Sequence, residues 1–174
     1  AYVSDLVAVV KEWMTHHNFA PDSLTIDEAE QTGQLQFSTS GKEGKYQAYL
    51  DLNLNHQWVE FYVYLTLKVP ERRRSAMADL LNRINLRMRV GNLEMLTRDG
   101  RMRWRCGFDI EGGALAGQML DNLDGIACND LDHYFAALMA VAFAGLDAER
   151  ALSNLGQGSD PPEPQWMQDT EPPP

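Results

Sequence analysis

The sequence contains few cysteines and no long apolar run. Its 174 residues include two cysteines, Cys106 and Cys128, whose spacing does not fit a metal site. No apolar run reaches the roughly 18 residues needed to cross a bilayer. The opening residues AYVSDLVAVV carry an acid where a signal peptide carries basic residues. We therefore expect a reduced, cytoplasmic protein with no membrane segment.

Motifs of common enzyme classes are also missing. The sequence has no GxxxxGK[ST], no GxGxxG after a strand, no HExxH and no GxSxG. The histidines at 16, 17, 56 and 133 lack zinc-ligand spacing. Paired acids such as Asp130 and Asp132 are stabilised by the dipole at a helix start without any catalytic role. The sequence predicts no catalytic residue, metal or cofactor, and hence a protein that is not an enzyme.

The net charge of −10 is unevenly distributed along the chain. Residues 1–70 carry nine acids and four lysines (net −5), and residues 71–105 carry four acids and ten arginines (net +6). Residues 106–174 carry twelve acids and one arginine (net −11). A basic centre between acidic flanks can pair internally, pair across a dimer, or bind an anionic partner. The candidate dimer or anion contacts are Arg72, Arg73, Arg101, Arg103 and Arg105.

Hydrophobic periodicity predicts one helix followed by strands. Apolar residues at helical spacing run from Val3 to His17, and Pro21 ends this helix. The period then changes to two, with short pieces near 24–26 and 35–37 and long alternating runs at 46–54 and 59–69. We group these pieces into three strands.

The two long runs carry aromatic residues on their outward face. Pairing of the runs in an antiparallel hairpin would gather Tyr49, Trp58, Tyr62 and Tyr64 into one patch. Two interpretations remain open. Later helices cover the patch or it simply stabilises the sheet, or it stays open and binds a protein partner or a second copy.

A helix and a hairpin come next. Apolar residues at helical spacing predict a helix from Glu71 to about Asn85. Asn85 and Gly91 tolerate the positive φ that is needed where the helix ends and a strand follows. Asp99 and Gly100 predict a two-residue turn of the primed type. The strand after it alternates strictly over 102–110, with Arg101, Arg103 and Arg105 on its other face.

The last part of the chain predicts helices and a tail. We expect a short helix over 114–125, a separate longer helix capped near Asp130, and a last turn capped by Asp147. Residues 1–155 then form one domain, and residues 156–174, rich in proline and acids, form a disordered tail. Within the tail, Trp166 and Met167 form a docking motif for another protein, or the tail only aids solubility.

Three segments carry a resemblance to a known family. They are LLNRINLRMRVGNLEM at 80–95, DGRMRWRCGFDI at 99–110 and LDHYFAALMAVAFAGLDAERAL at 131–152. The chain, from residue 1 to about 155, resembles the YbjN-domain proteins, known as bacterial sensory transduction regulators. The resemblance implies an α+β domain similar to type III secretion chaperones, with an antiparallel sheet flanked by helices in the order α-βββ-α-ββ-α. It also implies frequent dimers and supplies no active-site residue.

Three functions compete at this stage. The first is a non-enzymatic regulatory or chaperone-like module that binds protein and acts as a homodimer in bacterial signalling or stress regulation. The second is an anion or nucleic-acid binder that uses the arginine-rich helix and hairpin, which the acidic net charge disfavours. In the third, the hairpin arginines pair with Glu94, with acids of the C-terminal helices, or with a partner subunit.

Overall fold

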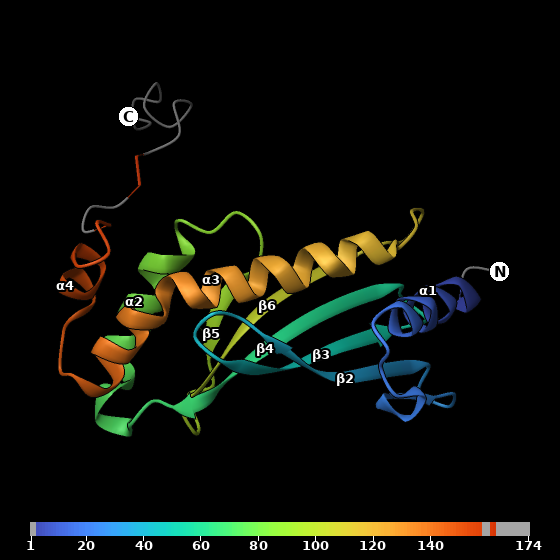
Figure 1. Cartoon of the computed structure of the whole chain (residues 1–174), viewed down its shortest axis with the longest axis horizontal. Coiled ribbons are helices and arrows are strands. Elements are labelled where there is room, and N and C mark those ends of the chain that lie inside the picture. The colour runs from blue at the N-terminus through green and yellow to red at the C-terminus, as the bar shows by residue number, and fades with distance from the viewer. Residues whose placement is uncertain (1–2, 158–160, 163–174) are drawn as a thin grey trace, which may run out of the picture.

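The structure, a computed structural model, describes residues 3–157 and 161–162. It has one antiparallel sheet flanked by helices (Figure 1), which confirms the predicted α+β class. The predicted tail, including Trp166 and Met167, lies outside the described residues except for Gly156, Gln157 and residues 161–162. Over the described residues, no helix combines the length and the apolar character that crossing a membrane requires.

The sheet has six strands and the helices are unequal in length. The strands are β1 (Leu24–Asp27), β2 (Thr32–Ser40), β3 (Lys45–Asn53), β4 (Trp58–Lys68), β5 (Asn92–Met95) and β6 (Arg101–Asp109). The α-helices are α1 (Val3–His16), α2 (Arg74–Asn85), α3 (Gly117–Phe143) and α4 (Ala148–Ser153), and two single turns of 3-10 helix are η1 (Pro21–Ser23) and η2 (Glu71–Arg73). Across the sheet the strands lie in the order β1-β2-β3-β4-β6-β5.

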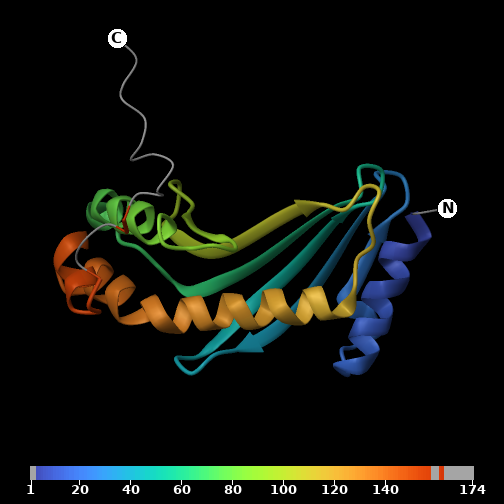
Figure 2. The same ribbon diagram turned by 90° about the horizontal axis from the view of Figure 1, so that it is seen from above.

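One face of the sheet is buried under α1 and α3 (Figure 2). Alternation along each strand places its apolar residues on this inner face, where they leave water together and provide the main stabilisation. The fully buried side chains there include Leu35, Leu50, Phe61 and Trp104. The predicted alternation of the long strands is therefore confirmed.

The acids of α3 attach that helix to its neighbours. Asp121 accepts hydrogen bonds from the indole of Trp13 at 2.8 Å and contacts His17 at 2.7 Å. Asp124 accepts from Thr39 at 3.0 Å, Asp130 from Trp104 at 2.9 Å, and Asp132 from the backbone N–H of Lys42 at 2.7 Å. These acids fix α3 against α1, β2 and β6, so they do not pair with the hairpin arginines.

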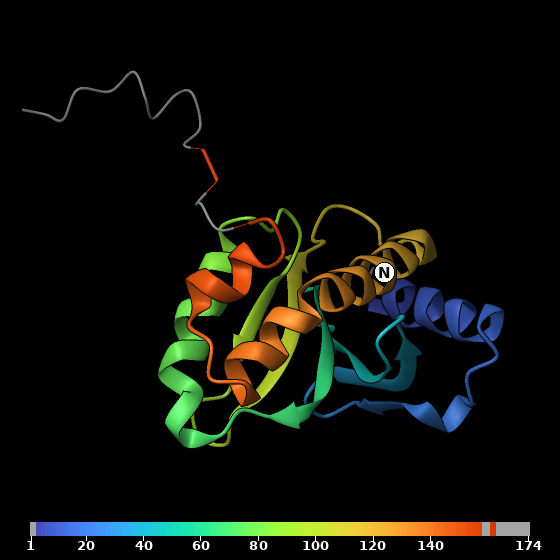
Figure 3. The same cartoon turned by 60° about the vertical axis from the view of Figure 1, so that its left-hand side comes forward.

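The other helices close the core at the β5 end of the sheet (Figure 3). Here α2 packs against α3, α4 and β5. The amide side chain of Asn85 bonds both backbone groups of Leu93: it accepts from the N–H at 2.8 Å and donates to the C=O at 2.9 Å. Asn85 thus occupies the free edge of β5 as a neighbouring strand would. At the other edge of the sheet lies the four-residue strand β1.

Three details differ from the sequence predictions. Four strands precede α2 rather than three, because the short piece 24–27 pairs with β2 as a strand of its own. The predicted break near Gly125 is wrong, since α3 runs unbroken through it, with Leu123 and Ala127 buried on either side. The predicted two-residue primed turn is also wrong. Leu96 and Arg101 are bonded across a four-residue loop in which Gly100, with φ +76°, has the positive φ and Asp99 does not.

Candidate functional site

The outer face of the sheet is not covered by any of the four α-helices (Figure 2). Pairing of the strands arranges its side chains in rows that run across β3, β4 and β6. In one row Tyr49 pairs with Tyr62 and Tyr62 with Arg105; in the next, Gln47 pairs with Tyr64 and Tyr64 with Arg103. The register therefore places tyrosines in the middle of the sheet beside a column of arginines on β6.

Arg103 covers Tyr62. Its guanidinium carbon lies 4.5 Å from the centre of the Tyr62 ring, and its Nη1 donates to the hydroxyl of Tyr64 at 2.9 Å. Its Nε donates to Glu94 at 2.8 Å. Tyr62 is consequently 8 % exposed. Tyr62 therefore lies beneath the surface of the outer face. Tyr49 and Tyr64 are half-buried at that surface, and their rings meet edge to face with centres 5.7 Å apart.

Two glutamates neutralise the arginines. Arg105 donates to Glu60 at 2.6 Å and to Glu94 at 3.3 Å, and the hydroxyl of Tyr62 donates to Glu60. That hydroxyl bond holds the pKa of Glu60 below its usual range against the opposing effect of burial. Burial, aided by the bond to Glu60, raises the pKa of Tyr62 to about 12. Arg103, Arg105, Glu60 and Glu94 thus form a network in which each charge is paired with an opposite one.

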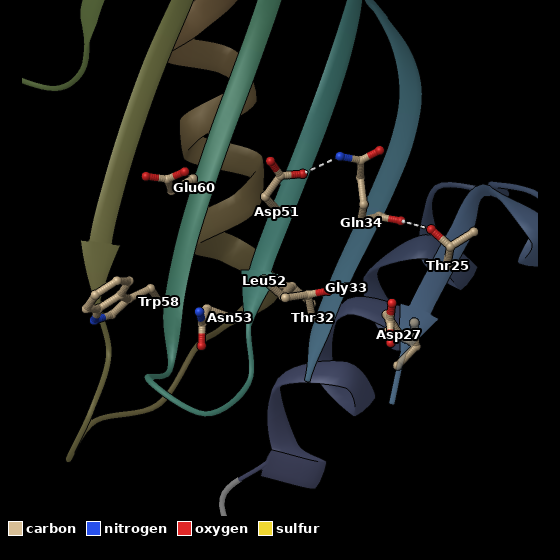
Figure 4. A pocket seen from close by; sticks show the side chains of 11 residues that line it. Thr25, Asp27, Thr32, Gly33, Gln34, Asp51, Leu52, Asn53, Trp58 and Glu60 are labelled. Carbon is tan, nitrogen blue, oxygen red and sulfur yellow. Dashed lines mark hydrogen bonds between the residues drawn. The ribbon is translucent and has the colours of Figure 1, made fainter. Parts of the chain in front are cut away.

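Two shallow grooves divide the outer face. The first, about 370 Å³, is lined by Tyr49, Tyr62, Tyr64, Arg101 and Arg103 among others. The second, about 670 Å³, lies toward β1 and has Trp58 on its wall (Figure 4). Gln34 and Asp51 line both grooves, so the two are adjacent. Trp58 is 49 % exposed and stacks on His56 at 4.7 Å.

All four predicted aromatic residues lie on the outer face, but only Tyr49, Tyr62 and Tyr64 line one groove, and Trp58 lines the other. The predicted arginine set is only partly brought together. Arg103 and Arg105 lie in the network, and Arg101 lies nearby, with its Nε 2.8 Å from Asp99. Arg72 is exposed in η2. Arg73 points to the end of α3, where it donates to the carbonyl oxygens of Val141, at 2.7 Å, and of Leu146. Arg73 therefore fastens α2 to α3.

These contacts bear on the interpretations of the basic centre. The predicted pairing of hairpin arginines with Glu94 is confirmed for Arg103 and Arg105. Their second acid is Glu60 of β4, rather than an acid of a C-terminal helix. Arginines with carboxylate partners have little capacity left for phosphate groups, so this geometry gives little support to an anion site.

The cysteines and the possible metal ligands do not form a reactive site among the described residues. Burial raises the pKa of both Cys106 and Cys128, and this favours the neutral thiol over the reactive thiolate. Among the described residues, no group of three or more histidine, cysteine or acidic side chains is placed to hold a metal ion.

Sequence reasoning did not pick out Gln34, Asp51 and Glu60 as site residues. The alternation of apolar and polar residues places Asp51 and Glu60 on the outward face, and this was the one sequence signal that indicated them as surface residues of the site. Their grouping depends on the register between β2, β3 and β4, which alternation within one strand does not specify.

Comparisons with known proteins identify the family of the chain. Residues 6–138 match the sequence model of the YbjN family, described as "Putative bacterial sensory transduction regulator". No curated protein matches the chain. A solved structure named "Structure of the HopA1-SchA Chaperone-Effector Complex" is similar, with 12 % identity and a TM-score of 0.46 over 74 % of this chain and 90 % of that one. A likeness this distant carries no argument about function.

Proposed function

The chain belongs to the YbjN family, and on this premise we propose that it is a non-catalytic regulatory module that holds a protein segment on the outer face of its sheet. The observation that carries the proposal is an uncovered sheet face on which four aromatic side chains lie beside a fixed network of charges. Tyrosine, tryptophan and arginine are the residues most enriched at protein interfaces.

The physical properties of this face suit binding. Tyr49 and Tyr64 present ring surface with few rotatable bonds, so they lose little conformational entropy when a partner packs on them. Arg103 and Arg105 are held by carboxylates and keep the face rigid before binding. The shallow, adjacent grooves fit an extended segment better than a compact ligand.

Affinity capture with a double variant tests the role of the face. We expect Tyr49→Ser with Tyr64→Ser to reduce recovery of native partners about tenfold or more, because interface aromatics carry most of the binding energy. Phe143→Ser is the matched control, since Phe143 is an exposed aromatic (57 %) at the end of α3. Circular dichroism must show both variants folded. Full recovery of partners by the double variant would exclude the outer face.

We also propose that the module forms a homodimer. The support is an apolar surface after α2, where Leu86 is 57 % and Val90 is 40 % exposed, because exposed apolar side chains close in sequence favour association. Sedimentation velocity should show a dimer that Leu86→Ser weakens. A wild-type monomer at every concentration tested would contradict this part of the proposal.

We further propose a cytoplasmic site of action in bacterial signalling or stress regulation, and the family description supports it. Fractionation of cells that express the tagged chain from its own promoter tests the compartment. Recovery of the chain outside the cytoplasmic fraction would contradict it. An anion or nucleic-acid binding role ranks behind protein binding, because Arg73, Arg103 and Arg105 already have partners within the chain.

A further inference from the structure

The groove beside Trp58 contains an unfavourable charge pair. Asp51 on β3 and Glu60 on β4 are directly opposite each other across the two strands. Like charges in that position destabilise a sheet. Eleven side chains line the groove; three of them are acids, Asp27, Asp51 and Glu60, and none is basic (Figure 4). The sheet therefore maintains a local excess of negative charge on a surface open to partners.

The three carboxylates are not equally satisfied. Glu60 is bound by Tyr62 and Arg105. Asp27 accepts the backbone N–H groups of Ala29 and Glu30, both at 3.0 Å, and so holds the turn after β1.

Asp51 is less well compensated. It receives one hydrogen bond, from the amide of Gln34 at 2.8 Å. Burial raises its pKa and so does the neighbouring charge of Glu60, whereas the bond from Gln34 and the charge of Arg103 lower it, with a net increase. Asp51 is therefore the carboxylate that would gain most from an additional cation.

One wall of the groove is apolar. Trp58 forms this wall, with an exposed indole that His56 stabilises by stacking. The outward-facing neighbours on β1 and β2 are the polar residues Thr25, Thr32 and Gln34. A long basic side chain needs both features, since its methylene stem packs on apolar surface while its charged end meets acids or an aromatic face.

We propose that this groove receives a lysine or arginine side chain from an extended protein segment bound across the outer face. The charged end lies between Asp51 and Glu60, and the stem lies against Trp58. The inference rests on the proposed function, because the same face holds the segment, and it specifies the partner as a basic peptide. The remainder of the segment extends over the adjacent groove toward Tyr49 and Tyr64.

Selection from a random library tests the proposal. A phage-displayed library of random peptides is panned on the full chain at near-physiological salt, roughly 0.15 M, where attraction between exposed charges more than about 8 Å apart is largely screened. Enriched peptides are then synthesised and their affinities measured by fluorescence anisotropy. We expect enriched peptides to contain lysine or arginine, and replacement of that residue by alanine to weaken binding about tenfold, as loss of a charged interface contact does.

Protein variants locate the contact. Asp51→Asn preserves shape and removes one negative charge, and Trp58→Ala removes the wall; each should weaken binding about five- to tenfold. Glu149→Gln is the matched control, because Glu149 is an exposed acid on α4 and its loss changes the net charge by the same amount. It should change affinity less than twofold.

Three results would overturn the inference, and they separate it from the proposed function. In the first, binding of the selected peptides depends on Tyr49 and Tyr64, but the peptides carry no excess of basic residues and Asp51→Asn does not weaken their binding. The basic-residue site in the groove is then wrong, and the proposal that the outer face binds protein is retained. If Glu149→Gln weakens binding as much as Asp51→Asn, the attraction is to the acidic protein as a whole. If no peptide depends on any outer-face residue, both proposals fail.

Discussion

The guanidinium group of Arg103 lies over the ring of Tyr62, 4.5 Å from the ring centre. Tyr62 points away from the core, yet Arg103 leaves it almost as buried as a core residue. On the outer face of this sheet, an ion-paired cation provides the cover that helices provide on the inner face. A single arginine side chain covers less of the sheet than a helix does, so Tyr49 and Tyr64 beside it remain partly exposed.

Substitution of Arg103 should therefore cost stability as well as charge. Arg103→Lys keeps the charge but loses the planar stack on Tyr62 and the forked bonds to Glu94 and Tyr64. We expect a loss of about 1–2 kcal/mol in the free energy of unfolding, measured by urea denaturation. Arg98→Lys is the control, because the Arg98 side chain is 74 % exposed. Equal losses in the two variants would argue against the stack.

The amide of Asn85 should protect the edge of β5. Asn85→Ala leaves the N–H and C=O of Leu93 without their partner, and we expect a loss of about 2 kcal/mol. Hydrogen exchange should show faster exchange of the Leu93 amide in the variant. Asn82→Ala, at an exposed position of the same helix, should leave that amide unchanged. An unchanged Leu93 amide in Asn85→Ala would show that other groups protect this edge.

Two glycines with the same backbone conformation should respond differently to alanine. Gly91 and Gly112 have φ of +73° and +78°. A Cβ at Gly91 would lie 2.3 Å from the ring of Trp104, whereas at Gly112 it would meet nothing within 4 Å. Gly112→Ala should cost about 1 kcal/mol from backbone strain alone. Gly91→Ala should cost clearly more, and thermal denaturation of the two variants measures the difference. Equal melting temperatures would mean that Trp104 moves aside without cost.

Asp124 should make stability depend on pH. Burial raises the pKa of Asp124 although Thr39 donates to it, and one of its carboxylate oxygens is buried without a partner. A raised folded-state pKa means that the folded chain binds the proton more tightly than the unfolded chain does. The stability that this proton supplies is complete below the unfolded pKa, near 3.9, and is lost as pH rises through the folded pKa.

The variant Asp124→Asn should remove this loss. We expect it to unfold at higher denaturant concentration than the wild type at pH 7, with a smaller advantage at about pH 3.5, where the wild-type carboxyl is largely protonated in both states. Glu28→Gln, at an exposed acid in the turn after β1, should show no such pattern. An advantage that is equal at both pH values would point to an effect other than protonation.

Periodicity in the sequence predicted the fold where a segment follows one pattern from end to end. The alternation over 46–54 and 59–69 correctly assigned the inward faces of β3 and β4, and Arg101, Arg103 and Arg105 were correctly placed opposite the buried face of β6. The family segments led to the correct family.

Predictions failed where tertiary contacts override local preference. Glycine at 125 weakens a helix locally, but burial of Leu123 and Ala127 on either side keeps α3 continuous. Asn85 was expected to adopt positive φ; it remains in α2 and acts through its side chain. The charge pair of Asp51 and Glu60 depends on strand register, so no single segment of the sequence reveals it.

The amide clamp of Asn85 has a consequence for how copies of this chain can join. A sheet with two free edges can add copies at both ends and grow into a fibre. Here one edge is occupied by the chain's own side chain, and the other ends in the short strand β1. Edge pairing between copies is thereby favoured at β1, and two chains joined through β1 leave no second β1 edge for a third chain.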